Sequence, residues 1–309
     1  MPDPTPFRLG TRRSPLALAQ AEETRTRLCA AHGWDESAVE LVPVVASGDR
    51  VQDRPLAEIG GKALWTKELD AWLLEGRIDA AVHSMKDVET VRPEAIALAA
   101  VLPRADVRDV LIGATSIMAL PEGATVGTSA PRRAAQLLHA RPDCRVITFR
   151  GNVDTRLARL AAGEADATFL AAAGLGRLAK HGVGTPLGLE EWLSAPSQGA
   201  IGIECRADDA RALELLAAIN HAESRAQVEA ERAFLAALGG TCHSPIALVS
   251  TGGTGEIALR AALFSPDGAE RVEGTATFPA GDNEGPTRLA RDLLARAAPA
   301  ITAHFNGSA

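Results

Sequence analysis

Arginines recur at three places where a predicted strand leads directly into a predicted helix. Arg12, Arg132 and Arg150 each lie in the turn or the first helical turn, and Ser, Thr or Asn stands near each of them. The first backbone N–H groups of a helix lack intrahelical partners and lie at the positive end of the helix dipole, so these junctions favour anions. One such arginine is often merely solvated, but three predict an anion-binding surface, because these junctions share one edge of an open parallel sheet.

Asp87 is the carboxylate best placed for chemistry. The segment IDAAVH (78–83) predicts a buried strand, and its carboxyl end presents Ser84, Lys86 and Asp87. An ionised aspartate in that place can face a cationic group. A surface ion pair between Lys86 and Asp87 explains the same pattern equally well. His83 fits a structural role better than that of a general base.

Cys242 lies in the segment GTCHSP, just after a predicted helix. The carboxyl end of a helix is the negative end of its dipole, which raises the pKa of a thiol. A reactive thiolate there needs a basic neighbour or a very reactive electrophile, and His243 is either such a neighbour or simply solvent-exposed. Lys62 lies in the glycine-led segment GGKALW and is free to approach an acid. That segment lacks the P-loop spacing and no GxGxxG follows a strand, so no nucleotide cofactor is predicted.

Capping residues mark the starts of the helices that carry the arginines. Ser14 is a natural N-cap, since it precedes a proline and then an apolar periodic run. Pro131 opens the second helix, with Ser129 or Ala130 as its cap, and Asn152 caps the third. The three helix starts are therefore predicted from local sequence alone.

Two α/β lobes and a third domain account for the order of the predicted elements. A Gly-Thr turn and a strand that begins Asp-Ala each occur twice, in the same order, which predicts two related lobes facing each other across a cleft. The strand predicted at 200–204 crosses back to the first lobe. Beyond it, a helix capped by Ser224, three strands and a last helix over 285–303 predict a small α+β domain. The expected domains are residues 1–102 with 198–219, residues 103–197, and residues 220–309.

Composition limits the classes of function. The 309 residues are 46% hydrophobic and 23% charged, as in an ordinary globular protein, and the net charge of −7 argues against general nucleic-acid binding. Four cysteines lie far apart without CxxC or Cys/His spacing, so neither disulfides nor a metal site is expected. The segment MPDPTPFRLG lacks a signal-peptide pattern and no long apolar run follows, so we expect a cytoplasmic protein without a membrane partner.

Seven segments, taken in order, resemble the porphobilinogen deaminase (hydroxymethylbilane synthase) family. They are LGTRRSPLALAQ, GGKALWTKELD, AAVHSMKDVET, VGTSAPRR, FRGNVDTRL, PSQGAIGIECR and GTCHSPIA. The resemblance implies two periplasmic-binding-protein-like α/β lobes around a cleft, a small α+β C-terminal domain, and a monomer. It also implies a transferase of haem and tetrapyrrole biosynthesis.

The resemblance implies a specific chemistry. Four molecules of porphobilinogen, a pyrrole with acetate, propionate and aminomethyl arms, are joined head to tail on a dipyrromethane cofactor bound to Cys242 through a thioether. Each round releases ammonia and passes through an electrophilic azafulvene, and hydrolysis then frees linear hydroxymethylbilane. Because an azafulvene is intrinsically reactive, the Cys242 thiol needs no strongly depressed pKa.

The resemblance also assigns roles to single residues. Asp87 matches the catalytic aspartate, which faces pyrrole N–H groups and stabilises developing positive charge. Lys86 and Arg12 accompany it. The remaining matches bind the cofactor (Cys242, Lys62, Ser84, Thr128, Ser129, Arg132, Arg133) or the substrate (Arg12, Ser14, Arg150, Asn152, Arg156, Arg177, Gln198), and no metal is implied.

The chain departs from the family pattern at Ala63, Trp65, Glu89, Pro131 and Thr241, where other residues are usual. Trp65 is expected to affect the mobility of its loop and the rate of turnover more than the kind of reaction. Two alternatives stay open. A solute-binding protein for a carboxylate ligand would need a signal peptide or a lipid anchor. An inactive family member would have lost the catalytic aspartate or the cofactor cysteine, and both are retained.

Overall fold

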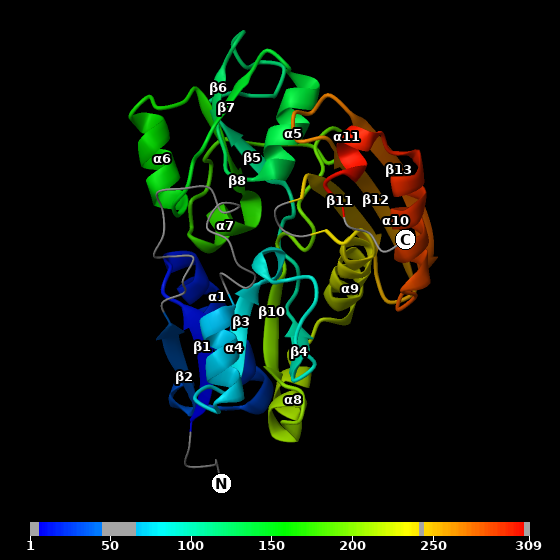
Figure 1. Cartoon of the computed structure of the whole chain (residues 1–309). Coiled ribbons are helices and arrows are strands. Elements are labelled where there is room, and N and C mark those ends of the chain that lie inside the picture. The colour runs from blue at the N-terminus through cyan, green and yellow to red at the C-terminus, as the bar shows by residue number, and fades with distance from the viewer. Residues whose placement is uncertain (1–5, 45–65, 241–243, 306–309) are drawn as a thin grey trace. The chain divides into compact units, whose positions relative to one another are not determined.

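The computed structural model describes residues 6–44, 66–240 and 244–305, which fall into two compact units. The first unit contains the described residues of Met1–Val51, Gly61–Ala105 and Ala200–Arg225. The second contains those of Asp106–Gly199 and Ala226–Ala309. Each unit is built around its own sheets (Figure 1). The chain therefore returns to the first unit after it has formed the lobe of the second.

The first unit holds a five-stranded mixed sheet of order β2-β1-β3-β10-β4. β1 pairs parallel with β2 and β3, and β10 runs antiparallel to both β3 and β4. The return of β10 to the first lobe, predicted from the sequence, is confirmed. The strands are β1 (Phe7–Arg12), β2 (Val39–Val44), β3 (Ala80–Ser84), β4 (Ile96–Val101) and β10 (Ile201–Arg206).

Helices cover both faces of this sheet. On one face, Leu28 and Leu216 of two helices pack with Leu9 and Ile203 of the strands. On the other, Leu69 packs in a second apolar cluster. Burial on both sides explains why β3 and β4 are largely apolar runs rather than alternating ones. The helices are α1 (Pro15–His32) and α8 (Ala210–Ala217) on the first face and α4 (Lys67–Leu74) on the second, with short 3₁₀ turns η1 (Glu36–Ala38) and η2 (Met85–Asp87).

The second unit repeats this strand pattern in a sheet of order β7-β6-β8-β5-β9. β6 pairs parallel with β7 and β8, and β5 runs antiparallel to β8. The Asp-Ala motif has the same local function in both lobes: Asp79 accepts a hydrogen bond from Arg8 N at 2.8 Å, and Asp166 accepts one from Thr125 N at 2.7 Å. The echo predicted from the sequence is thus confirmed. The strands are β5 (Asp109–Ile112), β6 (Thr125–Gly127), β7 (Arg145–Ile147), β8 (Ala167–Ala171) and β9 (Thr185–Pro186).

Three helices pack against the second sheet. Leu137 of α5 joins a cluster with Phe169 and Trp192 on one face. Leu157 and Leu175, from two further helices, pack in another cluster around β5 and β8. The helices are α5 (Pro131–Ala140), α6 (Val153–Ala161) and α7 (Ala172–Arg177).

A three-stranded antiparallel sheet of order β11-β12-β13 completes the second unit. Its side chains alternate: Leu259 and Leu263 pack in the cluster of α9 and α10, whereas Ala262 and Phe264 pack with Ala135 of α5. The predicted α+β domain is present, and it shares one compact unit with the second lobe. Its elements are α9 (Ala222–Ala237), β11 (Ile246–Gly252), β12 (Glu256–Phe264), β13 (Arg271–Pro279), α10 (Glu284–Arg296) and α11 (Pro299–Thr302).

Two local predictions for this region were wrong. Ser224 does not cap its helix, because α9 begins earlier and the Ser224 hydroxyl accepts a hydrogen bond from Arg104 N at 2.9 Å. The last helix is two helices, since Ala297 and Ala298 are extended. Pro299 explains the break, because a proline disfavours helical backbone at the residue before it.

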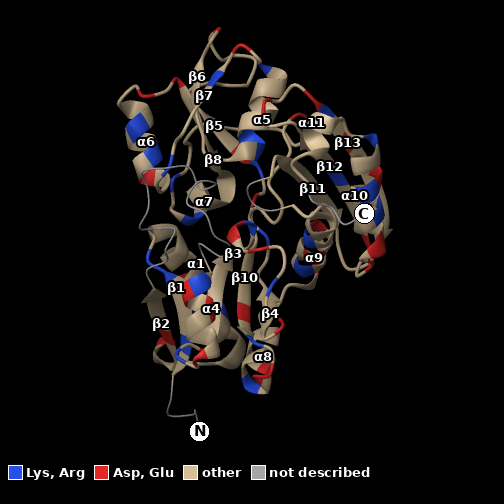
Figure 2. Cartoon of the chain, viewed as in Figure 1, with Lys and Arg blue, Asp and Glu red and all other residues tan. Residues whose placement is uncertain are grey.

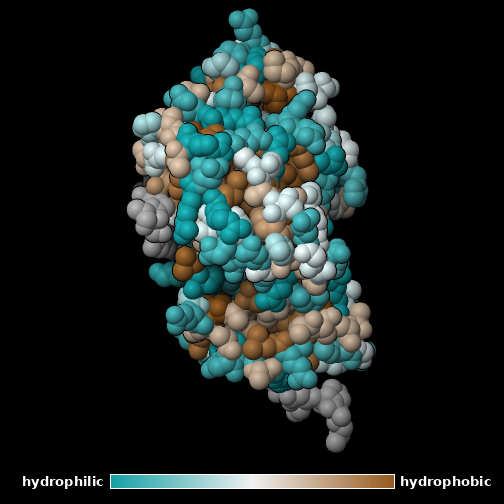
Figure 3. Space-filling model, turned by 90° about the vertical axis from the view of Figure 1, so that its right-hand side faces the viewer, coloured by the Kyte–Doolittle hydropathy of each residue, from teal (hydrophilic) through white to brown (hydrophobic). Residues whose placement is uncertain are grey.

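The outer helices carry mixed charge. Figure 2 shows basic and acidic residues close together on α9 and α10. On the side shown in Figure 3, hydrophobic residues form small groups separated by hydrophilic ones. Among the described residues, no helix combines the length and the apolar character that crossing a membrane requires.

Candidate active site

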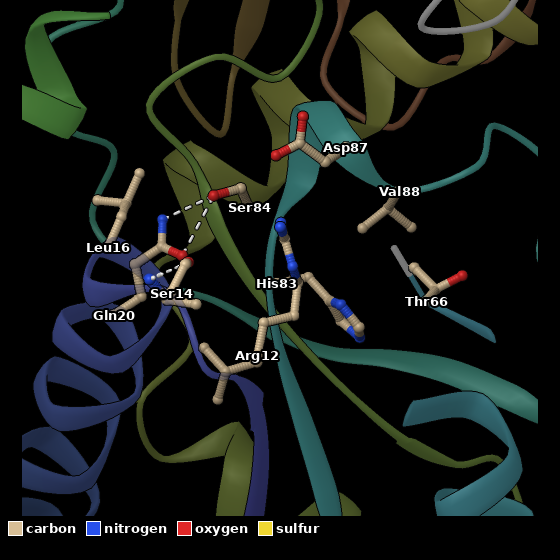
Figure 4. A pocket seen from close by; sticks show the side chains of 11 residues that line it. Arg12, Ser14, Leu16, Gln20, Thr66, His83, Ser84, Asp87 and Val88 are labelled. Atoms are coloured by element: carbon tan, nitrogen blue, oxygen red, sulfur yellow. Dashed lines mark hydrogen bonds between the residues drawn. The ribbon is translucent and has the colours of Figure 1, made fainter. Parts of the chain in front are cut away.

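A pocket in the first unit brings together four of the predicted site residues: Arg12, Ser14, Ser84 and Asp87 (Figure 4). It encloses about 400 Å³ of empty space, part of which is open to solvent. β1 and β3 are parallel neighbours, so the residues that follow their carboxyl ends meet at one edge of the sheet. The three arginine-bearing junctions were predicted to share one edge of an open parallel sheet, and this was wrong: β1 belongs to the first sheet, whereas β6 and β7 belong to the second, and both sheets are mixed.

The start of α1 forms one wall of the pocket. Ser14 is its N-cap, as predicted, and its hydroxyl accepts a hydrogen bond from Ala17 N at 3.3 Å. Helix starts present N–H groups and a positive dipole end. Arg12, at the end of β1, adds a fixed positive charge beside this start. This wall therefore suits a carboxylate.

Asp87 lies on the opposite side, at the end of the short turn η2. In the described part of the chain, no hydrogen bond or ion pair joins its carboxylate to another side chain, Lys86 included. The surface ion pair that the sequence left open is therefore not formed. A partly exposed carboxylate without a partner is available to N–H donors of a ligand.

Gln20 was missed from the sequence. It is buried on α1, and its amide nitrogen donates to the Ser84 hydroxyl at 2.7 Å, while that hydroxyl lies 3.1 Å from the Gln20 amide oxygen. The pair fixes the position of Ser84 between α1 and β3, as Figure 4 shows. Its only sequence signal is a polar residue within the apolar run of a helix that packs on the sheet.

A buried ionic network lies behind the pocket wall. Arg92 donates to both oxygens of Glu204, at 2.9 and 2.7 Å, and its Nη2 lies 2.6 Å from Asp70 Oδ1. His83 Nε2 lies 3.3 Å from the same Glu204, which supports the structural role expected for this histidine. Asp70, His83 and Glu204 offer metal-ligand atoms within 4.8 Å of one another. However, Arg92 forms ion pairs with the carboxylates of both Asp70 and Glu204. We interpret the group as an ion-pair network.

Glu204 makes the stability of this network depend on pH. Burial disfavours its charged form, but His83 and Arg92 outweigh burial and lower the pKa of Glu204 to about 2. Because the folded pKa is depressed, the stabilisation is complete above the ordinary pKa and is lost as pH falls toward 2. We expect the free energy of unfolding to fall by about 3 kcal/mol over this range through Glu204 alone.

Denaturant unfolding at pH values between 6 and 2, an interval of roughly two units on either side of an ordinary Glu pKa, checks this expectation. Glu204→Gln should have a shallower slope of unfolding free energy against pH than the wild type. Equal slopes for the two proteins would show that Glu204 is not the group that titrates.

In the second unit, the carboxylate of Asp109 binds three of the predicted site residues, Arg132, Arg133 and Gln198. Asp109 itself was not predicted from the sequence. Asp109 Oδ2 accepts from Arg132 at 2.8 Å, and Asp109 Oδ1 accepts from Arg133 at 2.7 Å and Gln198 at 2.9 Å. Burial opposes the charge on Asp109, but the two arginines hold its pKa far below the usual range. The cofactor and substrate roles of Arg132, Arg133 and Gln198 remain predictions. Some of the N–H groups of these three side chains already donate to Asp109.

The other predicted residues of the second unit follow β6 or β7 in the chain, except Arg177, which ends α7. Asn152 caps α6 as predicted, accepting from Thr155 N at 2.9 Å. Pro131 opens α5 as predicted, and of the two predicted caps the structure has Ala130. The Ser129 hydroxyl donates to the Phe149 carbonyl at 2.6 Å. Further contacts in this unit include Ala130 N to Thr128 Oγ1 at 3.2 Å, Arg156 Nε to Gly151 O at 3.1 Å and Arg177 Nη2 to Gly199 O at 3.1 Å. Arg150 is buried.

Several predicted residues lie outside the described part of the chain. They include the predicted cofactor residues Lys62 and Cys242, the neighbour His243, and the family departures Ala63, Trp65 and Thr241. Their roles remain predictions from the sequence.

Comparison with known proteins identifies the family. A family model described as the dipyromethane cofactor binding domain of porphobilinogen deaminase matches residues 7–214, and one described as its C-terminal domain matches residues 225–296. The chain belongs to the porphobilinogen deaminase family. The enzyme of this name from Sphingopyxis alaskensis is 55% identical over 97% of this chain and 96% of its own length. Porphobilinogen deaminase from Paracoccus denitrificans is 50% identical over 96% of each chain.

A plant member extends the likeness beyond bacteria. The chloroplastic porphobilinogen deaminase of Oryza sativa is 49% identical over 88% of this chain and 78% of its own length. Among solved structures, a substrate-binding domain of a putative amino acid ABC transporter from Streptococcus pneumoniae is 12% identical, with a TM-score of 0.41 over 69% of this chain and 90% of that one. The family match does not favour the solute-binding alternative.

The described residues fit the cofactor of a porphobilinogen deaminase, a pair of pyrroles that carry carboxylate arms. Asp87 offers an acceptor without a described partner to pyrrole N–H donors. Among the residues that the structure describes, Arg133 Nε is buried without a hydrogen-bond partner, and Asp109 balances only one of the two charges of Arg132 and Arg133. Each unit, taken by itself, offers one feature that suits a pyrrole with carboxylate arms: the first an acceptor for its N–H, and the second excess positive charge for its carboxylates.

Proposed function

We propose that the chain is a hydroxymethylbilane synthase, which joins four porphobilinogen molecules head to tail and releases linear hydroxymethylbilane. Each cycle breaks the bond between the aminomethyl carbon and its nitrogen, releases ammonia, and forms a carbon–carbon bond to the free α-carbon of a pyrrole, which loses its proton. Hydrolysis would finally break the carbon–carbon bond that joins the first ring of the product to the primer, with the hydroxyl of water added to the methylene carbon of that ring and a proton returned to the pyrrole carbon of the primer. The observation that carries the proposal is the Asp87 carboxylate, which has no partner among the described residues and lies in a pocket with Arg12 and Ser14, in a chain of this family.

Asp87 supplies electrostatic stabilisation. When ammonia leaves, positive charge spreads over the pyrrole ring and its N–H becomes a stronger donor. A carboxylate that accepts a hydrogen bond from this N–H stabilises the ring more strongly as more positive charge develops on it. It therefore stabilises the transition state more than the ground state. Because the carboxylate has no described protein partner, it loses no other bond in doing so.

The α1 wall positions the substrate. Arg12 and the backbone N–H of Leu16 provide donors for an acetate or propionate arm, because Pro15 has no N–H and Ala17 N donates to the Ser14 hydroxyl. Arg provides two parallel donors where Lys provides a point charge. The Gln20–Ser84 pair holds a hydroxyl at a fixed place between this wall and Asp87. Fixing a small pyrrole at its carboxylates and at its N–H leaves one orientation for the reacting carbon.

Cys242 is the proposed attachment point of the dipyrromethane cofactor. The cofactor supplies the nucleophilic pyrrole carbon on which the chain is built. The three cysteines that the structure describes are poor alternatives, because the thiolate is the reactive form and burial raises the pKa of each thiol, that of Cys205 to about 11. Lys62, Lys86, Thr128, Ser129, Arg132 and Arg133 are the further residues proposed to hold cofactor or growing chain, together with Arg150, Asn152, Arg156, Arg177 and Gln198.

Intact-protein mass spectrometry of the purified protein tests the proposal. We expect the chain to weigh more than its sequence by two porphobilinogen molecules less two ammonia molecules, and Cys242→Ala to lack this increment and all turnover. Cys144→Ala, in a buried position of the second unit, is the matched control and should keep the increment. A wild type of bare-chain mass would contradict the proposal.

We also propose that the enzyme works as a monomer in the cytoplasm, with porphobilinogen as its small-molecule partner. The support is the family resemblance. Sedimentation velocity of the loaded protein measures the first of these points, and a dimer at micromolar concentration would contradict it.

A further inference from the structure

Asp109 links segments of the second unit that are far apart in the sequence. Each of its oxygens accepts two hydrogen bonds: Oδ1 from Arg133 Nη2 at 2.7 Å and Gln198 Nε2 at 2.9 Å, and Oδ2 from Arg132 Nη2 and Trp192 Nε1, both at 2.8 Å. Its side chain is fully buried. The carboxylate therefore has no oxygen left to contact a ligand directly.

Each of three donors is fixed a second time by a main-chain carbonyl. Arg132 Nη1 donates to Leu193 O at 2.7 Å, and Arg133 Nη1 donates to Phe169 O at 3.0 Å. Gln198 Nε2 donates to Val107 O at 2.7 Å as well as to Asp109. Two acceptors define the plane of a guanidinium group, so Asp109 and these carbonyls together set where the remaining N–H groups lie.

The charge of the cluster is not balanced. One carboxylate faces two guanidinium groups, whose side chains are each 6% exposed. Within the described residues these two arginines have no other ion-pair partner, and Arg133 Nε has no hydrogen-bond partner. A buried excess charge with an unsatisfied donor is costly for an arrangement that serves folding alone. The imbalance suits a cluster that receives a further anion.

We propose that Asp109 is a positioning residue that holds Arg132, Arg133 and Gln198 in the orientation in which they receive a carboxylate of the growing chain. This rests on the proposed function, which assigns these three residues to cofactor and substrate binding. Asp109 acts through its neighbours and never touches the ligand. Removal of the positive charges of Arg132 and Arg133 would weaken ligand binding directly. Loss of Asp109 would weaken it too, because the two guanidinium groups would then take other orientations.

Asp109→Asn tests this with the loaded enzyme. The amide keeps the size of the carboxylate but sets an NH₂ group against N–H donors. We expect the KM for porphobilinogen to rise about 10- to 100-fold, the range that loss of a hydrogen bond to a charged group produces, with a much smaller fall in kcat. The fraction of chains that carry the dipyrrole mass should fall as well.

Trp192→Phe keeps the test decisive if Asp109→Asn does not fold. It removes one donor to Asp109 and keeps a ring to stack on Phe169, whose centroid lies 4.8 Å away. We expect KM to rise by about three- to tenfold, the effect of one ordinary hydrogen bond. Leu120→Ala, a buried residue of the same apolar cluster, is the control for lost stability and should leave the KM of the folded protein unchanged. A KM within about twofold of the wild type in every folded variant would overturn the proposal.

Nitrogen NMR of the arginine Nε–H groups gives a readout that does not need turnover. In the wild type the signals of Arg132 and Arg133 should exchange slowly with water, and in Asp109→Asn or Trp192→Phe they should shift and exchange faster. Unchanged signals would overturn the proposal. If the wild type itself makes no product and carries no dipyrrole, the proposed function fails, and this measurement still decides whether Asp109 orients the two arginines.

Discussion

Asp87→Asn should fold normally, keep the mass of the attached dipyrrole, and lower kcat by about 10²- to 10³-fold, as loss of one group that stabilises developing charge does in other enzymes. The amide keeps the shape of the carboxylate and an oxygen acceptor, but it has no negative charge. No described side chain depends on Asp87 for a hydrogen bond, so the substitution leaves no new unsatisfied group. The loss should therefore appear in kcat rather than in stability.

Single-turnover and steady-state kinetics measure this loss, with circular dichroism and intact mass to confirm fold and cofactor. Asp35→Asn is the matched control, since this exposed aspartate of the first unit makes no side-chain capping bond. It should keep full activity. Near-normal turnover of Asp87→Asn would remove Asp87 from the mechanism, whereas loss of the dipyrrole mass would move its role from turnover to cofactor assembly.

Arg92→Ala should destabilise the protein by about 3–5 kcal/mol, because removal of one partner of a buried ion pair leaves the other charge uncompensated. Glu204 is 1% exposed, and Arg92 donates to both of its oxygens. Arg92 also lies 3.1 Å from Glu89, so its loss leaves several carboxylates facing one another.

Denaturant unfolding at neutral pH measures the effect. Arg77→Ala is the matched control: this exposed arginine of the same unit stacks on Trp72 and pairs only loosely with Glu75, and its loss should cost less than about 1 kcal/mol. A loss of similar size for both variants would show that the network contributes no more than a surface pair.

Local signals in the sequence were sufficient for most of the secondary structure. The caps Ser14 and Asn152 were predicted because a side chain and an N–H three residues later decide them. Ser224 misled because its hydroxyl binds Arg104, a partner that no local rule reveals. The break before Pro299 could have been predicted from the proline itself. The apolar residues on both sides continue the helical periodicity, so one continuous helix was predicted instead.

The candidate site also contains residues that the sequence could predict and residues that it could not. The resemblance named Arg12, Ser14, Ser84 and Asp87 as site residues, and the structure places them in one pocket because the carboxyl ends of parallel neighbours meet by geometry. Asp109, which binds Arg132, Arg133 and Gln198, follows from pairings over long sequence distances, and nothing in its flanks indicates it. Gln20, Glu204 and Trp192 were missed for this reason too.

The position of β10 between β3 and β4 has a consequence for the order of folding. During synthesis, β3 emerges long before β10, so the first sheet lacks an inner strand until the whole second lobe has left the ribosome. The apolar edges of β3 and β4 are meanwhile exposed, and an exposed strand edge invites wrong pairing. Contacts of such long range are also slow to form. The first sheet of the nascent chain therefore stays incomplete until β10 is made. Asp87, the proposed catalytic aspartate in the turn η2 after β3, reaches its final surroundings only then.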